Sequence, residues 1–175
     1  MNSVGLTPDK IEIPGVDESL KVNETPQNYV KRIAKEKAFS ISTPNKSFLI
    51  TADTIVTVGR RVLMKTNDKT KAQEHLRLLS GRRHCVSTAF CVKHNGLVNS
   101  YLVKTFLKMR LLTQNEIDAY IESAEWEGCA GAYSIQGRAK SFFPFISGCF
   151  TNVIGLPIPK LIRVLNGLGF CQKVQ

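Results

Sequence analysis

The chain has 175 residues, of which 43% are hydrophobic, which is enough for one globular domain or for two small lobes that share a core. No apolar run reaches the roughly 20 residues that span a bilayer, and the N-terminus lacks the charged start and apolar stretch of a signal peptide. The cysteines form no CxxC pair, which favours free thiols in a reducing cytoplasm over disulfides or a zinc site. They are Cys85, Cys91, Cys129, Cys149 and Cys171.

The net charge of +10, from 24 Lys and Arg against 14 Asp and Glu, favours anionic ligands. The basic residues are spread along the chain and do not form a long basic tract. This distribution is typical of a solvated surface or of a phosphate-binding cleft, and a nucleic-acid track is the least favoured of the three interpretations.

Strand and helix signals alternate along the chain. The expected strands cover residues 11–13, 47–58, 62–64, 85–93, 97–111, 142–145 and 151–154. The expected helices begin at Thr25-Pro26, near Lys71, at Thr113 and at Pro157. Asn95-Gly96 between two long strand candidates predicts a hairpin, and Thr113 with Glu116 predicts a capping box. The pattern indicates an α/β fold with a mixed sheet.

Two acidic positions are candidates for chemistry. Asp53 ends the apolar run of residues 49–52 and precedes Thr54, so we expect a carboxylate at a strand end. Such a carboxylate can hold a divalent metal or act as a general base toward water, although a solvated aspartate in a turn is the simpler alternative. Asp17-Glu18 is a second acidic pair, for which, taken alone, an ordinary loop is the simpler explanation.

Candidate ligand-binding side chains lie elsewhere. Lys37, at the end of the first helix, and Lys65, after a short strand, can each meet phosphate oxygens, or can simply be solvated. Gln136 lies in a loop with Gly131 and Gly137, where its amide can read a base edge or can bond to the backbone. The sequence contains neither GxxxxGK[ST] nor GxGxxG, and its three histidines have no metal-ligand spacing.

Four blocks, in this order and spacing, resemble the Maf family of nucleotide pyrophosphatases over nearly the whole chain. The blocks are Glu24-Thr25-Pro26 with residues 29–38; Ala52-Asp53-Thr54-Ile55-Val56; Leu79-Ser80-Gly81-Arg82 with His84, Val86 and Thr88-Ala89; and residues 130–137 with 152–157. The resemblance implies an elongated α/β fold with a mixed sheet and flanking helices, in which two lobes surround a cleft. It also implies hydrolysis of nucleoside triphosphates to monophosphate and pyrophosphate with Mg²⁺ or Mn²⁺.

The resemblance assigns roles to particular residues. Asp53 falls on the catalytic acid/base position, and Glu18 on an acidic position near the metal, so the metal is expected at these two carboxylates. Lys37 and Lys65 fall on phosphate-binding positions, and Arg82 is a further candidate for the phosphates. Thr54 and Gln136 fall on positions tied to base choice. The sequence Tyr133-Ser134-Ile135-Gln136 is more similar to the branch that acts on dTTP and UTP.

Two departures from the family pattern bear on these expectations. The family begins with a strand and a Ser-x-Ser-Pro-Arg-Arg loop that binds the triphosphate, whereas Met1 falls within the helix that follows this loop. The resemblance therefore predicts a single domain, residues 1–175, without that strand and loop. Met64-Lys65-Thr66 replaces the usual Gly-Lys-Pro, and Cys129 stands where a lysine is frequent.

Two alternative functions stay open, the first because of the missing loop and the second because it shares the same chemistry. The first is a catalytically weak protein that binds nucleotides or nucleic acid and acts in septum formation during cell division. The second is a triphosphatase for noncanonical purines, of the inosine type. A homodimer is compatible with the sequence as well.

Overall fold

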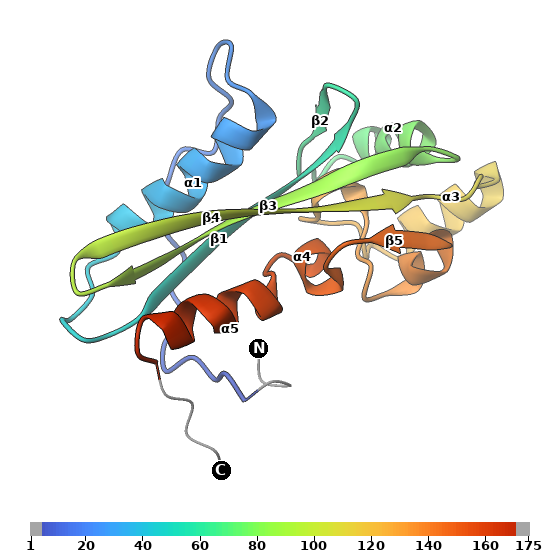
Figure 1. The fold of residues 1–175 in the computed structure, drawn as a ribbon. Coiled ribbons are helices and arrows are strands. Elements are labelled where there is room, and N and C mark those ends of the chain that lie inside the picture. Colours follow the sequence, from blue (N-terminus) through green and yellow to red (C-terminus); the bar gives the residue numbers. More distant parts are fainter. Residues whose placement is uncertain (1–4, 171–175) are drawn as a thin grey trace.

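The computed structural model describes residues 5–170 and is built on one five-stranded sheet (Figure 1). The strands are β1 (Leu49–Val58), β2 (Arg61–Leu63), β3 (Arg83–His94), β4 (Leu97–Lys108) and β5 (Phe145–Ser147). Their order across the sheet is β2-β1-β3-β4-β5, and every pairing is antiparallel. The α/β fold with flanking helices is confirmed, but the sheet is not mixed. A parallel pair of strands requires a right-handed crossover connection, and no such connection joins neighbouring strands within residues 5–170.

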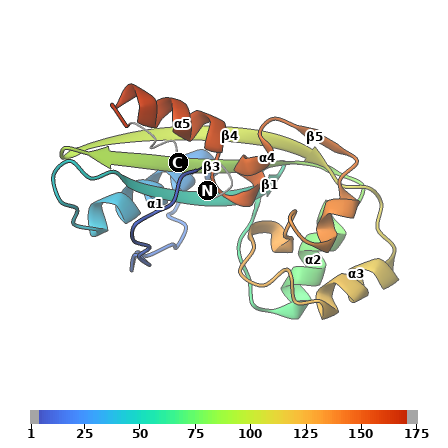
Figure 2. The same cartoon turned by 90° about the horizontal axis from the view of Figure 1, so that it is seen from below.

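Helices cover both faces of one half of the sheet. α1 (Pro26–Ser40) packs on β1, β3 and β4, whereas α4 (Phe150–Ile154) and α5 (Ile158–Gly167) lie on the opposite face (Figures 1 and 2). Buried side chains of α1, such as Ile33, meet Ile55 of β1, and Leu161 of α5 belongs to a cluster with Phe90 of β3. The long strands are therefore sandwiched between helices.

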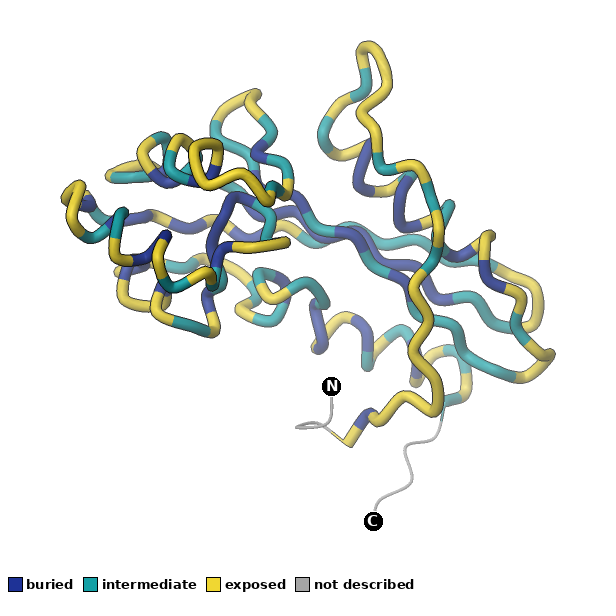
Figure 3. The backbone as a smooth tube through the Cα atoms, turned by 180° about the vertical axis from the view of Figure 1, so that it is seen from behind, coloured by how far each residue is buried: buried dark blue, intermediate teal, exposed yellow. Residues whose placement is uncertain are grey.

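A second cluster of helices closes the other half of the sheet. It contains α2 (Lys69–Leu79), α3 (Gln114–Glu122) and the short 3₁₀ segments η2 (Ala130–Ala132) and η3 (Arg138–Phe142). Their core surrounds Trp126 and includes Val56 at the end of β1. The buried residues follow the strands into both halves of the molecule (Figure 3). The two lobes thus share the strands β1 and β3.

Several local signals are confirmed. The Thr25 hydroxyl caps α1 by accepting from the Asn28 amide at 3.3 Å, and Thr113 and Glu116 form the expected reciprocal capping box at α3. Asn95 and Gly96 both have positive φ angles, 49° and 78°, as a two-residue turn between antiparallel strands requires.

Other expectations are wrong. Residues 11–13 form no strand, and the Ile11 and Ile13 side chains are 82% and 97% exposed. β-branched residues favour a strand only where a partner strand and an apolar surface are available. The expected N-terminal helix at Met1 lies outside the described residues, and no helix occurs between Gly5 and Thr25.

The segment from 142 to 154 also differs from its prediction. Residues 138–142 form η3 and residues 145–147 form β5, whereas the expected strand at 151–154 is the helix α4. Asn152 anchors this helix, because its buried amide donates to the Val86 carbonyl and to Thr105 Oγ1, each at 3.1 Å. A short apolar run does not by itself distinguish a strand from a buried helix.

β1 is paired along only part of one edge. β2 pairs with residues 56–58 of β1, and within the described residues no strand pairs with Leu49–Ile55 on that side. We call this segment the open edge of β1. Asp53 lies within it, opposite Ala89 of β3, and therefore in the middle of a strand and not at its end.

Burial of His84 should make the fold sensitive to acid. Desolvation lowers the pKa of His84 from 6.5 to about 4, and its Nε2 lies 2.9 Å from the Tyr133 hydroxyl. The unfolded chain therefore takes up a proton first as the pH falls below 6.5. Above pH 6.5 His84 is neutral in the folded and the unfolded chain, and its contribution to the free energy of unfolding is fully present. As the pH falls from 6.5 toward 4, this contribution decreases by about 1.4 kcal/mol per pH unit.

We expect the free energy of unfolding to fall between pH 7 and pH 5 by about 2 kcal/mol more in the wild type than in His84→Gln, which cannot titrate. Urea denaturation at both pH values measures this difference. Equal pH dependence in the two proteins would contradict the assignment.

Candidate active site

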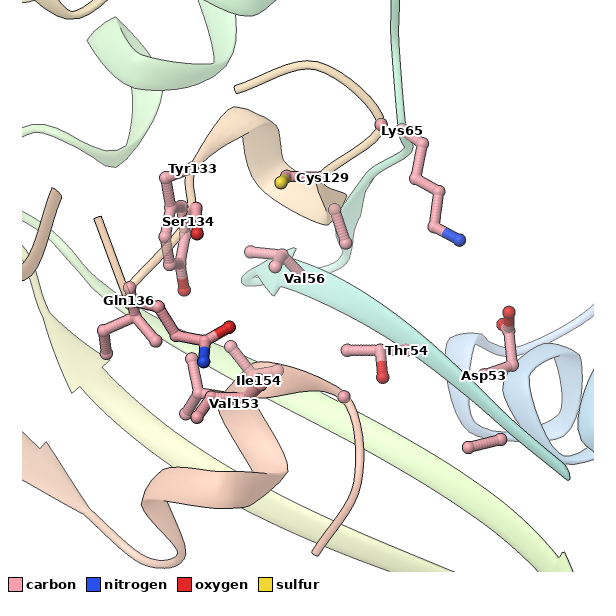
Figure 4. Close-up of a pocket in the computed structure, with 16 residues that line it drawn as sticks. Asp53, Thr54, Val56, Lys65, Cys129, Tyr133, Ser134, Gln136, Val153 and Ile154 are labelled. Atoms are coloured by element: carbon pink, nitrogen blue, oxygen red, sulfur yellow. The ribbon is translucent and has the colours of Figure 1, made fainter. Parts of the chain in front are cut away.

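A cavity of about 330 Å³ lies beside the open edge of β1, between the two lobes. Its volume is at the lower end of the range for small-molecule sites, roughly 300–1,000 Å³. The walls come from β1, the segment after β2, the loop before and after η2, and α4 (Figure 4). The lining includes Asp53, Thr54, Lys65, Cys129, Tyr133, Ser134, Gln136, Val153, Ile154 and Gly155.

The cavity passes around the edge of the sheet because neighbouring residues of β1 point to opposite faces. Asp53 points toward α1, where it meets Lys37, and Thr54 points to the other face, beside Gly155 at the end of α4. Thr54 lies between Asp53 and Gln136 in Figure 4. We call the part near Asp53 and Lys65 the charged end, and the part between Thr54 and Gln136 the amide end.

Asp53 joins a cluster of three charged side chains behind the charged end, and Lys37 and Glu18, the other two members, do not line the cavity themselves. The Lys37 ammonium, from the last turn of α1, lies 2.9 Å from Asp53 Oδ1 and 2.5 Å from Glu18 Oε1. The Asp53 side chain is only 3% exposed. One lysine thus brings together two carboxylates that are 35 residues apart in the sequence.

Burial and pairing set the ionisation of this cluster. Burial raises the pKa of Asp53, and the Lys37 ammonium offsets only part of the effect. Burial opposes the charged form of Lys37, but its hydrogen bonds to Glu18 and Asp53 prevail and raise its pKa. Desolvation of the more exposed Glu18 is outweighed by Lys37, so its pKa is lowered. Asp53 is therefore a stronger base than a solvated aspartate.

The loop that carries Glu18 is fixed on α1. The Tyr29 hydroxyl donates to the Glu18 carbonyl at 2.9 Å, and Arg32 donates to the Ser19 carbonyl at 2.9 Å. Arg32 also forms a bidentate pair with Glu24 at 2.7 and 2.8 Å. These contacts hold the Glu18 carboxylate against Lys37, although residues 6–21 have no regular secondary structure.

The remaining basic candidates differ in position. Lys65 is exposed, lines the charged end, and has no carboxylate within 4.0 Å among residues 5–170. Lys37 reaches the site through its contact with Asp53. Arg82 lies exposed in the turn between α2 and β3 and does not line the cavity. Resemblance alone suggested it, and the fold places it elsewhere.

At the amide end, the Gln136 side chain lies beside the apolar side chains of Val153 and Ile154. Gln136 is exposed and its side chain makes no hydrogen bond to the described residues, so it does not stabilise its own loop. A side chain at Gly131, where φ is 72°, would lie 2.9 Å from Val56, and one at Gly137 would overlap the Glu125 carboxylate. The two glycines therefore serve to pack the loop against the protein.

Sequence reasoning missed several aspects of this site. Cys129 lines the cavity, and burial raises the pKa of its thiol. Tyr133, Ser134, Val153 and Ile154 belong to the recognised blocks, yet nothing in their spacing revealed that they share one wall. The contact of Lys37 with both carboxylates depends on the packing of α1 on β1, which no local signal encodes.

The chain is similar to known proteins over most of its length. Residues 1–168 match the family described as Maf-like protein. The chain is 40% identical over 167 residues to a dTTP/UTP pyrophosphatase of Roseobacter denitrificans, covering 95% of this chain and 89% of that protein. It is 42% identical over 173 residues to a dTTP/UTP pyrophosphatase of Maricaulis maris, covering 97% and 82%.

A nucleoside triphosphate pyrophosphatase of Anaplasma phagocytophilum is 40% identical over 165 residues, covering 93% of this chain and 85% of that protein. The family match spans residues 1–168 and therefore both lobes. The chain therefore belongs to the Maf family.

Proposed function

We propose that this chain hydrolyses nucleoside triphosphates to monophosphate and pyrophosphate, with dTTP and UTP as preferred substrates. The observation that carries the proposal is a single cavity that is lined by Asp53 and Lys65 at one end and by Gln136 beside apolar side chains at the other. In this proposal the triphosphate occupies the first part and the base occupies the second. The names of the relatives, dTTP/UTP pyrophosphatase and nucleoside triphosphate pyrophosphatase, support the same reaction.

In this proposal Asp53 orients and deprotonates the attacking water. Its raised pKa makes it a better proton acceptor than a solvated aspartate, and phosphates bound by Lys65 would lie in the cavity that Asp53 also lines. Lys65 presents an unpaired ammonium to phosphate oxygens. Lys37 stays charged and holds Asp53 and Glu18 in place.

Asp53 and Glu18 are the residues that would hold Mg²⁺ or Mn²⁺. Their carboxylate oxygens are hard ligands and lie within 2.9 Å of the same Lys37 nitrogen. No group of three or more metal-ligating side chains occurs within residues 5–170, so two carboxylates would share the ion with phosphate oxygens and water, as is usual for Mg²⁺. When bound, the ion would screen the phosphate charge.

The other expectations have less support. No observation favours a weak nucleic-acid-binding protein or an inosine-type enzyme.

No helix between residues 5 and 170 is long and apolar enough to cross a membrane. Cys85, Cys91, Cys129 and Cys149 are free thiols, which fits the proposed cytoplasmic location, while Cys171 lies outside the described residues. The homodimer stays a prediction.

The direct test is product analysis with UTP, dTTP, CTP, ATP and GTP. We expect pyrophosphate and monophosphate, fastest from UTP and dTTP, with activity lost in EDTA and restored by Mg²⁺ or Mn²⁺. Release of orthophosphate and a diphosphate would contradict the proposed reaction. Salt-sensitive binding of oligonucleotides without any hydrolysis would favour the binding-protein alternative.

Replacing Asp53 by Asn should remove the base and keep the shape of the side chain. We expect kcat for UTP to fall by about 10²–10⁴-fold, which is typical for loss of a general base, with an unchanged circular dichroism spectrum. Asp9→Asn, on the exposed segment before α1, is the matched control and should retain full activity. Near wild-type turnover in Asp53→Asn would rule out this role.

Replacing Gln136 by Ala should alter base preference, because the unbonded amide is the adaptable polar group at the amide end. We expect kcat/KM for UTP, dTTP and CTP to fall by about tenfold relative to that for GTP, the equivalent of one hydrogen bond. Gln27→Ala, at an exposed position of α1, serves as the control. A uniform loss with all four nucleotides would assign Gln136 a structural role.

A further inference from the structure

The hydroxyl of Thr54 has a hydrogen-bond direction that its neighbours determine. Thr88 Oγ1 lies 2.9 Å from the main-chain carbonyl oxygen of Asn152. Because a carbonyl oxygen can only accept a hydrogen bond, the Thr88 hydroxyl donates its single proton to it. Thr54 Oγ1 lies 2.9 Å from Thr88 Oγ1. Because the Thr88 proton is already used, Thr54 must donate its own proton to Thr88.

This arrangement is rigid. Thr88 is 0% exposed and lies directly opposite Thr54 in the β1–β3 ladder. Asn152 is also fully buried, and its amide nitrogen is bonded to Val86 and Thr105. The main-chain carbonyl of Asn152, which accepts the hydrogen bond from Thr88, is therefore fixed relative to β3 as well as to α4. Reversing the bond between the two threonines would break the bond from Thr88 to the Asn152 carbonyl without forming another within the described residues, which costs about 0.5–1.5 kcal/mol.

This hydrogen-bond direction matters for ligand binding, because Thr54 lines the cavity. With its proton directed at Thr88, Thr54 Oγ1 presents only lone pairs to a ligand. It can accept a hydrogen bond but cannot donate one, so it favours a ligand with an N–H group at that point.

We propose that Thr88 is a positioning residue that makes Thr54 an obligate acceptor, and that the site thereby selects pyrimidines with a protonated ring nitrogen. Uracil and thymine carry an N–H at ring position 3, whereas the same nitrogen of cytosine carries a lone pair that would face the lone pairs of Thr54. This inference rests on the proposed function, because it assumes that the base occupies the amide end.

Gln136 cannot make this distinction alone. A carboxamide has a donor and an acceptor, and by turning about its last bond it can match either uracil or cytosine. Gln136 is exposed, and no side chain or backbone group among residues 5–170 forms a hydrogen bond that fixes the orientation of its amide. A fixed choice between the two bases therefore requires a group with a fixed direction, and Thr54 is such a group.

The test uses Thr88→Val, which keeps the shape of the side chain and removes the hydroxyl. The Asn152 carbonyl keeps a partner, the Gly155 amide at 3.1 Å, so the fold should persist. Thr54 would then be free to rotate and to donate toward the cavity. We expect the ratio of kcat/KM for UTP over CTP to fall about tenfold, the equivalent of one hydrogen bond. Thr88→Ser retains the hydroxyl and should keep the wild-type ratio.

Thr51→Val is the matched control. Thr51 is another buried threonine of β1, and its hydroxyl donates to the Ala34 carbonyl at 2.7 Å on the face away from the amide end. This variant loses the same kind of bond but should leave the UTP/CTP ratio unchanged.

The dissociation constants of UMP and CMP for the same variants, measured by calorimetry, separate this inference from the proposed reaction. We expect the UMP preference to fall about tenfold in Thr88→Val even if the chain hydrolyses slowly. Equal losses for both nucleotides in Thr88→Val would overturn the inference and leave the proposed function standing. If the chain does not hydrolyse nucleotides but still prefers UMP over CMP in a way that depends on Thr88, the proposed function is overturned and the inference stands. If neither nucleotide binds, both are overturned.

Discussion

The pairing of β1 with β3 is the constraint on which the rest of the site depends. Nine consecutive residue pairs, from Leu49 with Lys93 to Thr57 with Cys85, fix β1 in register. Because side chains alternate along a strand, this register directs Asp53 to one face and Thr54 to the other. A shift by one residue would exchange the two faces and separate Asp53 from Lys37. The proposed chemistry and the proposed base recognition would therefore both depend on one ladder of hydrogen bonds.

The open edge of β1 explains how one ligand can reach both faces. A strand with neighbours on both sides would separate the charged end from the amide end by a continuous layer of backbone. Since β2 pairs only with residues 56–58, the cavity can pass around Asp53 and Thr54. The same feature exposes backbone groups, and on an ordinary surface such an edge invites association with another strand. In this fold the edge lies beside a cleft between two lobes.

The charged end shows how packing prepares a reactive group. Placing a carboxylate in a nearly dry position is unfavourable unless a cation accompanies it. Lys37 provides that cation, but it is shared with Glu18, and Asp53 retains a raised pKa. The bidentate contact of Arg32 with Glu24 and the Tyr29 hydroxyl fix the loop that completes the cluster. An irregular segment thus acquires a defined position through side chains of α1.

Sequence predicted the features that depend on neighbouring residues and missed those that depend on distant ones. The Thr25 cap and the Asn95-Gly96 turn are local, and both are present. The strand predicted at 151–154 is a helix because Asn152 finds its partners on β3 and β4. Asp53, Lys65, Thr54 and Gln136 were identified through motifs and do share a cavity, but Arg82, chosen in the same way, does not. The direction of the Thr54 hydrogen bond follows only from three-dimensional contacts.

The measurement that tests this account most directly is a crystal structure of the chain with a UTP analogue whose α–β bridging oxygen is replaced by an imido group. The account predicts the uracil between Thr54 and Gln136 and the phosphates beside Lys65 and Asp53, with the nucleotide passing around the open edge of β1. A nucleotide bound in the reverse orientation, or outside this cavity, would contradict it.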